Sequence, residues 1–114
     1  GGSAFSGRRG MIIVLGSVRT DAGNRAAIEA ESIAHCNRSR AEPGCIAHNC
    51  HFDAEDPDLL VFIEKWADAD ALRAHFAVPD SHHFISALRK LAKEPSVIEI
   101  FGAEPVDFAA LAKP

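Results

Sequence analysis

Three alternating side chains in one apolar segment could form part of a binding site. The segment Leu59–Trp66 reads LLVFIEKW, and Phe62, Glu64 and Trp66 in it are separated by two positions. Because side chains alternate between the faces of a β-strand, these three project from the same face. We expect Phe62 and Trp66 to form an aromatic wall and Glu64 to accept a hydrogen bond from a small molecule. The alternative is a core tryptophan with a satisfied ring nitrogen, beside a glutamate paired with a cation.

His75 lies on the apolar side of a predicted helix. Leu72, His75 and Phe76 follow Asp68, a favourable N-cap, at spacings of three and four. The imidazole therefore points at the rest of the fold. Imidazole titrates near physiological pH, so His75 could take a proton from a substrate. A lone histidine in this position is also compatible with a satisfied core residue, and both interpretations stay open.

Further histidines and cysteines offer weaker signals. His82 and His83 stand at the start of a helical stretch, and we expect His83 to reach the mouth of a pocket, the alternative being that both are solvated. His48 and Cys50 alternate onto one face of a strand and could chelate as a pair. A structural zinc site needs four ligands, however, and no second cluster with ligand spacing is visible. We therefore expect no metal.

The elements that position these residues follow the order β-α-β-β-α-β, with the second helical region broken at Pro79. Apolar alternation and turn residues predict four strands: Met11–Arg19, Cys45–Phe52, Leu59–Trp66 and residues 96–102. One helix precedes the Glu42-Pro43-Gly44 stop, with Ala26, Ala30 and Ile33 on its apolar face. A second starts after Asp68, and a third is capped by Ser81. This order predicts an α+β, ferredoxin-like fold with an antiparallel four-stranded sheet.

Two strands are apolar on both faces. Residues 11–15 and 59–63 carry apolar side chains at odd and even positions alike, although helices can cover only one face of the sheet. The other face would be an unusually large exposed apolar patch, and a second copy of the chain is the simplest cover. The sequence thus predicts a homodimer joined through the sheet.

Composition limits the class of protein and partner. The hydrophobic fraction of 47% in 114 residues predicts one folded domain, and the longest uninterrupted apolar runs are too short to cross a membrane. A formal net charge of -4 without a basic stripe argues against nucleic acid. The number of cysteines is odd, and a domain of this size does not need disulfides to fold. We therefore expect Cys36, Cys45 and Cys50 to be reduced thiols. Together these features predict a soluble cytoplasmic protein without membrane or nucleic-acid partners.

The chain ends and the cofactor motifs add little. Residues 1–10 are small, polar and basic, and we expect a disordered leader or a remnant of cloning. The folded domain is expected over residues 11–103, followed by a tail at 104–114 that holds one helical turn. No Gly-x-Gly-x-x-Gly, phosphate loop or Gly-x-Ser-x-Gly motif occurs, so we expect no nucleotide cofactor and no serine hydrolysis.

Several segments together resemble a known family. They are the stretches 40–45 (RAEPGC), 62–66 (FIEKW), 71–76 (ALRAHF) and 79–84 (PDSHHF), the last with an insertion relative to the family. With them the chain, from Met11 to about Phe101, resembles the antibiotic biosynthesis monooxygenase (ABM) domain. The resemblance implies a dimeric α+β barrel with a pocket between helices and sheet. In several members such a pocket adds oxygen to a phenol, quinol or polyketide aromatic without metal or flavin.

For this chain the resemblance implies a cofactor-independent monooxygenase that acts on a small aromatic, phenolic or quinol-like molecule. His75 would be the base or anion stabiliser and Trp66 the second catalytic residue, with Phe62, Glu64 and His83 binding the substrate. An alternative is a non-catalytic ligand-binding or stress-related module of the same fold, which the lack of tyrosine favours slightly. Haem degradation is disfavoured, because the first strand offers Ser17 where that branch of the superfamily has an asparagine.

Overall fold

The computed structural model describes residues 10–114, so most of the expected leader, residues 1–9, lies outside the described residues. Eight elements follow in order: β1 (Met11–Arg19), α1 (Arg25–Ser39), β2 (Cys45–Phe52), β3 (Leu59–Trp66), α2 (Ala69–Ala77), α3 (Pro79–Leu91), β4 (Val97–Ala103) and α4 (Phe108–Ala112). None of the helices in this part of the chain has the length and apolar character needed to cross a membrane.

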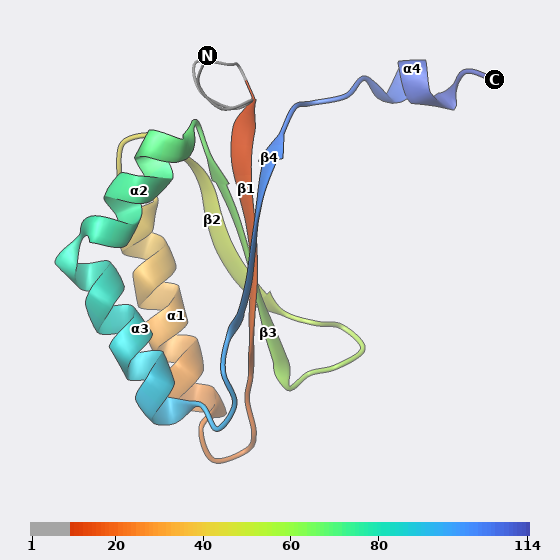
Figure 1. Ribbon diagram of the computed structural model, residues 1–114. Coiled ribbons are helices and arrows are strands. Elements are labelled where there is room, and N and C mark those ends of the chain that lie inside the picture. The colour runs from red at the N-terminus through yellow and green to blue at the C-terminus, as the bar shows by residue number, and fades with distance from the viewer. Residues whose placement is uncertain (1–9) are drawn as a thin grey trace.

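The four strands form one antiparallel sheet in the order β2-β3-β1-β4. Helices α1, α2 and α3 all lie on the same face of this sheet, as Figure 1 shows. The predicted α+β, ferredoxin-like fold is therefore confirmed. The break in the second helical region is confirmed too, because α2 ends at Ala77 and α3 begins at Pro79.

The sheet register places the alternating residues of β3 at the centre of the helix-covered face. Phe62, Glu64 and Trp66 are all buried, as their spacing predicts. Glu64 lies between Val14 of β1 on one side and His48 of β2 on the other. A carboxylate and an imidazole are thus paired across two strands in the interior.

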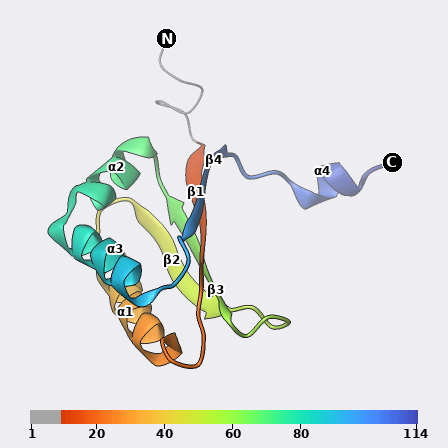
Figure 2. The ribbon, with the colours of Figure 1, turned by 60° about the horizontal axis from the view of Figure 1, so that its bottom comes forward.

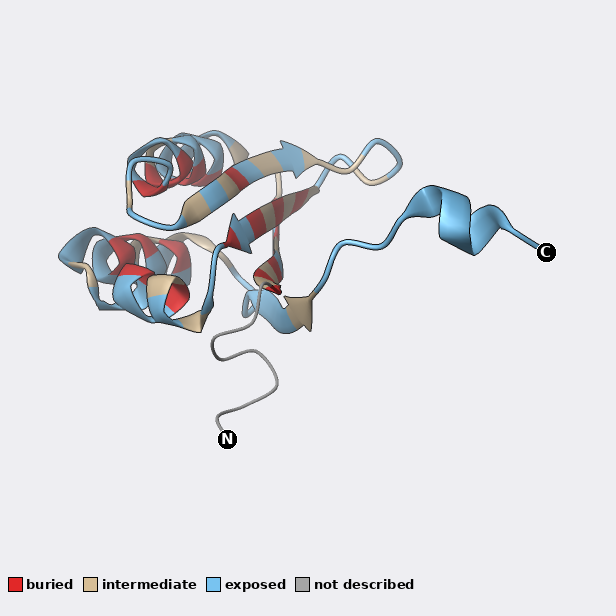
Figure 3. Ribbon diagram, turned by 90° about the horizontal axis from the view of Figure 1, so that it is seen from above, coloured by how far each residue is buried: buried red, intermediate tan, exposed pale blue. Residues whose placement is uncertain are grey.

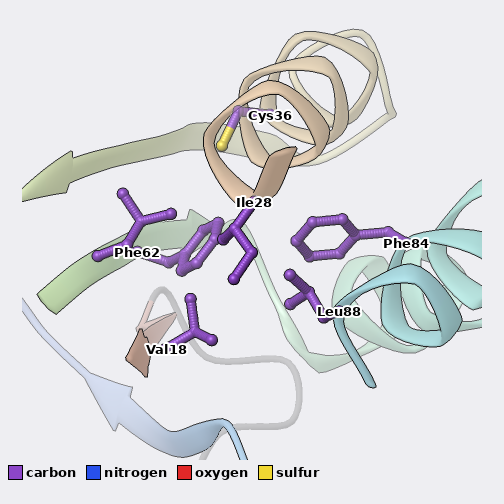
Figure 4. Packing of buried hydrophobic residues seen from close by; sticks show 7 residues of the cluster. Val18, Ile28, Cys36, Phe62, Phe84 and Leu88 are labelled. Carbon is purple, nitrogen blue, oxygen red and sulfur yellow. The ribbon is translucent and has the colours of Figure 1, made fainter. Parts of the chain in front are cut away.

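An apolar core surrounds this polar centre on both sides. One cluster joins Val18, Ile28, Cys36, Leu60, Phe62, Phe84 and Leu88, and Figure 4 shows the aromatic rings of Phe62 and Phe84 between the sheet and the helices. The second cluster contains Ile12, Val14, Trp66 and Leu72. Burial of these apolar side chains supplies the main driving force for folding.

Helix α1 turns a different face inward from the one that its apolar residues suggested. The expected core residue Ile33 is 47% exposed, whereas Ile28 is fully buried. The remaining buried positions of α1 are Ser32, His35, Cys36 and Ser39. These positions follow Ile28 at helical spacing. Burial of the Ile28 side chain therefore fixes which face of α1 packs on the sheet, although the other residues of that face are mostly small or polar.

The start of α3 also differs from the expectation. Ser81 was expected to cap this helix, but the N-cap is Val78 with Pro79 in the first turn. The Ser81 hydroxyl instead donates to the His75 carbonyl oxygen at 2.7 Å. Ser81 therefore satisfies the end of α2 and ties the two helices together.

The opposite face of the sheet carries no helix within the described chain. On this face, Leu15 of β1 lies next to β4, where Val97 and Phe101 are exposed. Beyond β4 the tail leaves the domain and forms the expected helical turn, α4, which projects away from the sheet in Figures 2 and 3. Its apolar residues Phe108 and Leu111 are exposed, Phe108 to 83%.

Gly44 in the turn before β2 has the one positive φ among residues 10–114, at 81°. A Cβ built there would lie 2.5 Å from the Cβ of Ala71 on α2. We expect Gly44→Ala to lower the free energy of unfolding by about 2 kcal/mol or more, since a left-handed conformation alone costs about 1–2 kcal/mol. The control is Gly23→Ala, whose new Cβ would meet only Asp21 Oδ1 at 3.4 Å. Equal stability of the two variants in denaturant titrations would contradict this account of the turn.

Candidate functional site

Three buried histidines from three elements meet beneath the helices. They are His35 of α1, His48 of β2 and His75 of α2, called here the histidine cluster. Their ring centroids are 5.1 Å apart for His35 and His48, 5.2 Å for His35 and His75, and 5.4 Å for His48 and His75. Local sequence patterns indicated a site role only for His75, because His48 and His35 stand 27 and 40 positions before it and share no element with it.

His75 is oriented by a carboxylate. Its Nδ1 lies 2.8 Å from Oε1 of Glu42, in the turn between α1 and β2. With Glu42 ionised, Nδ1 carries the proton and donates it, which leaves the lone pair on Nε2. The indole of Trp66 packs against the ring at 4.6 Å between centroids. This arrangement holds an imidazole in one tautomer and stabilises any positive charge that it acquires.

Glu64 is held at the bottom of the site by Trp66. The indole Nε1 donates to Glu64 Oε1 at 2.9 Å. The same oxygen lies 3.4 Å from Nε2 of His48, but without hydrogen-bond alignment, so Nε2 remains unsatisfied. Burial raises the pKa of the Glu64 carboxyl above its ordinary value, and the Trp66 hydrogen bond partly opposes that shift.

The other two imidazoles of the histidine cluster are kept neutral. Burial, reinforced by neighbouring charges, lowers the pKa of His35 to about 3 and that of His48 to about 4. His35 stacks on Phe84 at 4.0 Å, whereas His48 Nδ1 contacts the Cys36 sulfur at 3.2 Å. Burial also raises the pKa of the Cys36 thiol to about 12, so this group stays protonated.

A cavity of about 610 Å³ opens beside the cluster, between α3 and the sheet. A volume of this size suits a small organic ligand. Its inner wall includes His35, Phe62, Glu64, His75 and Phe84. Its outer part includes the exposed residues Arg89, Lys93, Val97 and Ile98.

The five residues singled out from the sequence fall into two groups. His75, Phe62 and Glu64 line the cavity, whereas Trp66 and His83 do not. Trp66 is fully buried behind Glu64 and His75, so it acts on the site through these two side chains. His83 is exposed, because Ser81, Phe84 and Leu88 form the buried face of α3 and His83 lies off that face.

Comparison with known proteins identifies the family and agrees with the fold. The family model for antibiotic biosynthesis monooxygenases matches residues 11–87. The chain belongs to this family. The family match runs from the start of β1 into α3 and therefore includes Glu42, Glu64 and the whole histidine cluster.

Proteins similar to this ABM chain come from several different organisms. An uncharacterized protein of Synechocystis is 30% identical over 90 residues, which are 79% of this chain and 61% of that relative. The chain thus spans less than two thirds of the length of this curated relative. A Deinococcus radiodurans protein assigned to the same family has a TM-score of 0.81 at 23% identity, covering 84% of this chain and 95% of its own.

A third relative is a conserved protein of unknown function from Bacteroides thetaiotaomicron, described as a possible oxidoreductase. It has a TM-score of 0.78 at 24% identity over 83% of this chain and 99% of its own. At such identities the two structural likenesses establish the shared ABM fold.

The buried neutral histidines predict a loss of stability in acid. Below pH 6.5 the unfolded chain protonates His35 and His48, whereas the low pKa values in the folded chain, about 3 for His35 and about 4 for His48, keep both rings neutral until much lower pH. The stability present above pH 6.5 is therefore lost progressively towards pH 4, by at most about 1.4 kcal/mol per pH unit for each histidine. Denaturant titrations with a chelator present measure this slope.

His48→Gln removes one of the two titrating groups and should reduce the slope, whereas the exposed His82→Gln should leave it unchanged. A free energy of unfolding that stays constant between pH 6.5 and 5 in the parent protein would contradict the neutral state of the buried rings.

Proposed function

We propose that this chain is a cofactor-independent monooxygenase for a small aromatic, phenolic or quinol-like molecule, with His75 as the general base. The observation that supports it most is the Nδ1 contact of His75 with Glu42, at 2.8 Å, on a ring that lines the cavity. The proton-accepting Nε2 is then available to a ligand, and Glu42 stabilises the imidazolium. The membership in the ABM family agrees with this activity.

The chemistry requires little from the protein beyond this base. A quinol that loses a proton becomes an electron-rich anion, which can react with O₂ directly. One oxygen atom enters the ring and the other leaves as water, so that quinol and O₂ yield hydroxyquinone and water. The two electrons needed come from the quinol itself, and no flavin or metal enters this balance.

The remaining cavity residues would bind and orient the substrate. Phe62 and Phe84 offer apolar surface for a flat ring, and Glu64 offers a hydrogen-bonding group for a hydroxyl. Trp66 is proposed as a positioning residue, because its indole fixes the Glu64 carboxyl and packs on His75. A role for His83 would require it to move from its exposed place on α3.

Oxygen consumption tests the proposal. Assays with a panel of quinols and a chelator present should show turnover by the parent, and His75→Ala should lower kcat by about 100-fold or more, the usual range for a general base. Glu42→Gln should lower kcat less, because the base keeps its ring but loses the carboxylate that orients Nδ1 and stabilises the imidazolium. His82→Ala, exposed on α3, is the matched control.

Turnover unchanged in His75→Ala would remove this residue from the mechanism. Tight binding of an aromatic ligand without turnover by any panel member would favour the alternative, a non-catalytic ligand-binding module.

We further propose that a second copy of the chain covers the open sheet face. Leu15, Val97 and Phe101 expose apolar surface there, and the tail carries Phe108 and Leu111 beyond the domain. A homodimer would bury this surface, which is costly to leave in water.

Light scattering should give the mass of two chains for the parent and of one chain for Leu15→Lys. The control is Ile33→Lys, which places the same charge on the outer side of α1 and should leave the mass at two chains. A parent protein that is a monomer in dilute solution would overturn the dimer.

A further inference from the structure

The histidine cluster has the dimensions of a metal site. One ring nitrogen from each of His35, His48 and His75 lies within 4.8 Å of the others, and all three residues are buried. In a tetrahedral zinc site with Zn–N bonds of about 2.0–2.1 Å, the centroids of neighbouring imidazoles lie about 5 Å apart. The observed separations of 5.1, 5.2 and 5.4 Å match that value. Small rotations of the rings would bring their nitrogens onto one ion.

Two of the three rings have buried nitrogens without a partner. His35 Nδ1 and His48 Nε2 make no hydrogen bond. A buried polar atom without a hydrogen-bond partner lowers the stability of the folded state. A cation bound by these two nitrogens would remove that destabilisation.

The third ring is held as metal-binding histidines usually are. Such a ligand donates its second ring N–H to a carboxylate or carbonyl, which fixes its tautomer and orientation. The contact of His75 Nδ1 with Glu42 Oε1 at 2.8 Å reproduces this pattern and leaves the Nε2 lone pair of His75 for an ion.

From this geometry we infer that His35, His48 and His75 form a site for a divalent transition-metal ion of the zinc type. Three imidazoles suit Zn²⁺, Co²⁺ and Ni²⁺ better than Mg²⁺ or Ca²⁺, which require oxygen ligands. The sequence alone does not predict this site, because only the neighbouring pair His48 and Cys50 has the spacing of metal ligands. Its three ligands come from a helix, a strand and a second helix.

The surroundings provide charge balance and access. Glu64 Oε1 lies 3.4 Å from His48 Nε2, and Glu42 contacts His75, so two carboxylates face a divalent charge. The positive charge of Arg40 partly counters this balance, because Arg40 lies close to the cluster and its Nε donates a hydrogen bond to the His48 carbonyl oxygen. His35, His75 and Glu64 line the cavity, which gives an ion a path from solvent and leaves a fourth coordination position to Glu64 or water.

Metal binding and the proposed base compete for one atom. An ion held by His75 Nε2 occupies the lone pair that would accept the substrate proton. The metal-bound form is therefore the inhibited form of the proposed oxygenase. This consequence rests on the proposed function, whereas the site itself does not.

Titration with Co²⁺ in the absence of any substrate tests the site. We expect one Co²⁺ per chain, with the strong visible absorption of a tetrahedral ion that Zn²⁺ then displaces. His48→Gln should weaken binding by more than about 100-fold, and Glu42→Gln by about 10- to 100-fold, the usual effect of losing a partner behind a ligand. His82→Gln, on the exposed side of α3, should bind as the parent does. Circular dichroism establishes whether each variant is folded. If His48→Gln does not fold, the comparison of the parent with Glu42→Gln tests the site.

Two results would overturn the site: no visible Co²⁺ spectrum with the parent, or equal affinity in the parent and Glu42→Gln. If the protein turns over a quinol, stoichiometric Zn²⁺ should stop it, and full activity of the Zn²⁺-loaded protein would overturn the inhibitory consequence. Absence of turnover leaves the Co²⁺ result intact, so failure of the proposed function and failure of the metal site are distinguished.

Discussion

The burial of three imidazoles beneath one layer of helices is the constraint on which the site depends. Each ring belongs to a different element, so the cluster exists only when α1, α2 and the sheet are packed together. Desolvation keeps His35 and His48 neutral, whereas Glu42 orients His75 and can stabilise its charged form. Within this one polar centre of the core, His75 can therefore accept a proton, whereas His35 and His48 stay neutral.

Local sequence patterns were sufficient for the fold and for one wall of the site. The β-α-β-β-α-β order followed from apolar alternation and from stops such as Glu42-Pro43-Gly44 and Pro79. The burial of Phe62, Glu64 and Trp66 followed from their spacing on β3, since strand parity is a local property. These predictions needed no knowledge of which elements meet in space.

The rest of the site depends on contacts between distant positions. In the sequence, Glu42 belongs to the Glu42-Pro43-Gly44 segment that ends a helix. No local pattern indicates that its carboxylate contacts His75, 33 positions later. The apolar pattern of α1 favours Ile33 as an inward residue and gives no sign of His35, although helical spacing from Ile28 includes position 35. His48 was noticed with Cys50, but its true neighbours Cys36 and Glu64 come from other elements.

Nitrogen-detected NMR of the histidine side chains tests the central claim most directly, because it reports the protonation state of each ring nitrogen. In metal-free protein at pH 7, the account predicts that His35 and His48 are neutral and that His75 carries its proton on Nδ1. Fully protonated His35 or His48 at that pH, or a proton on Nε2 of a neutral His75, would contradict it.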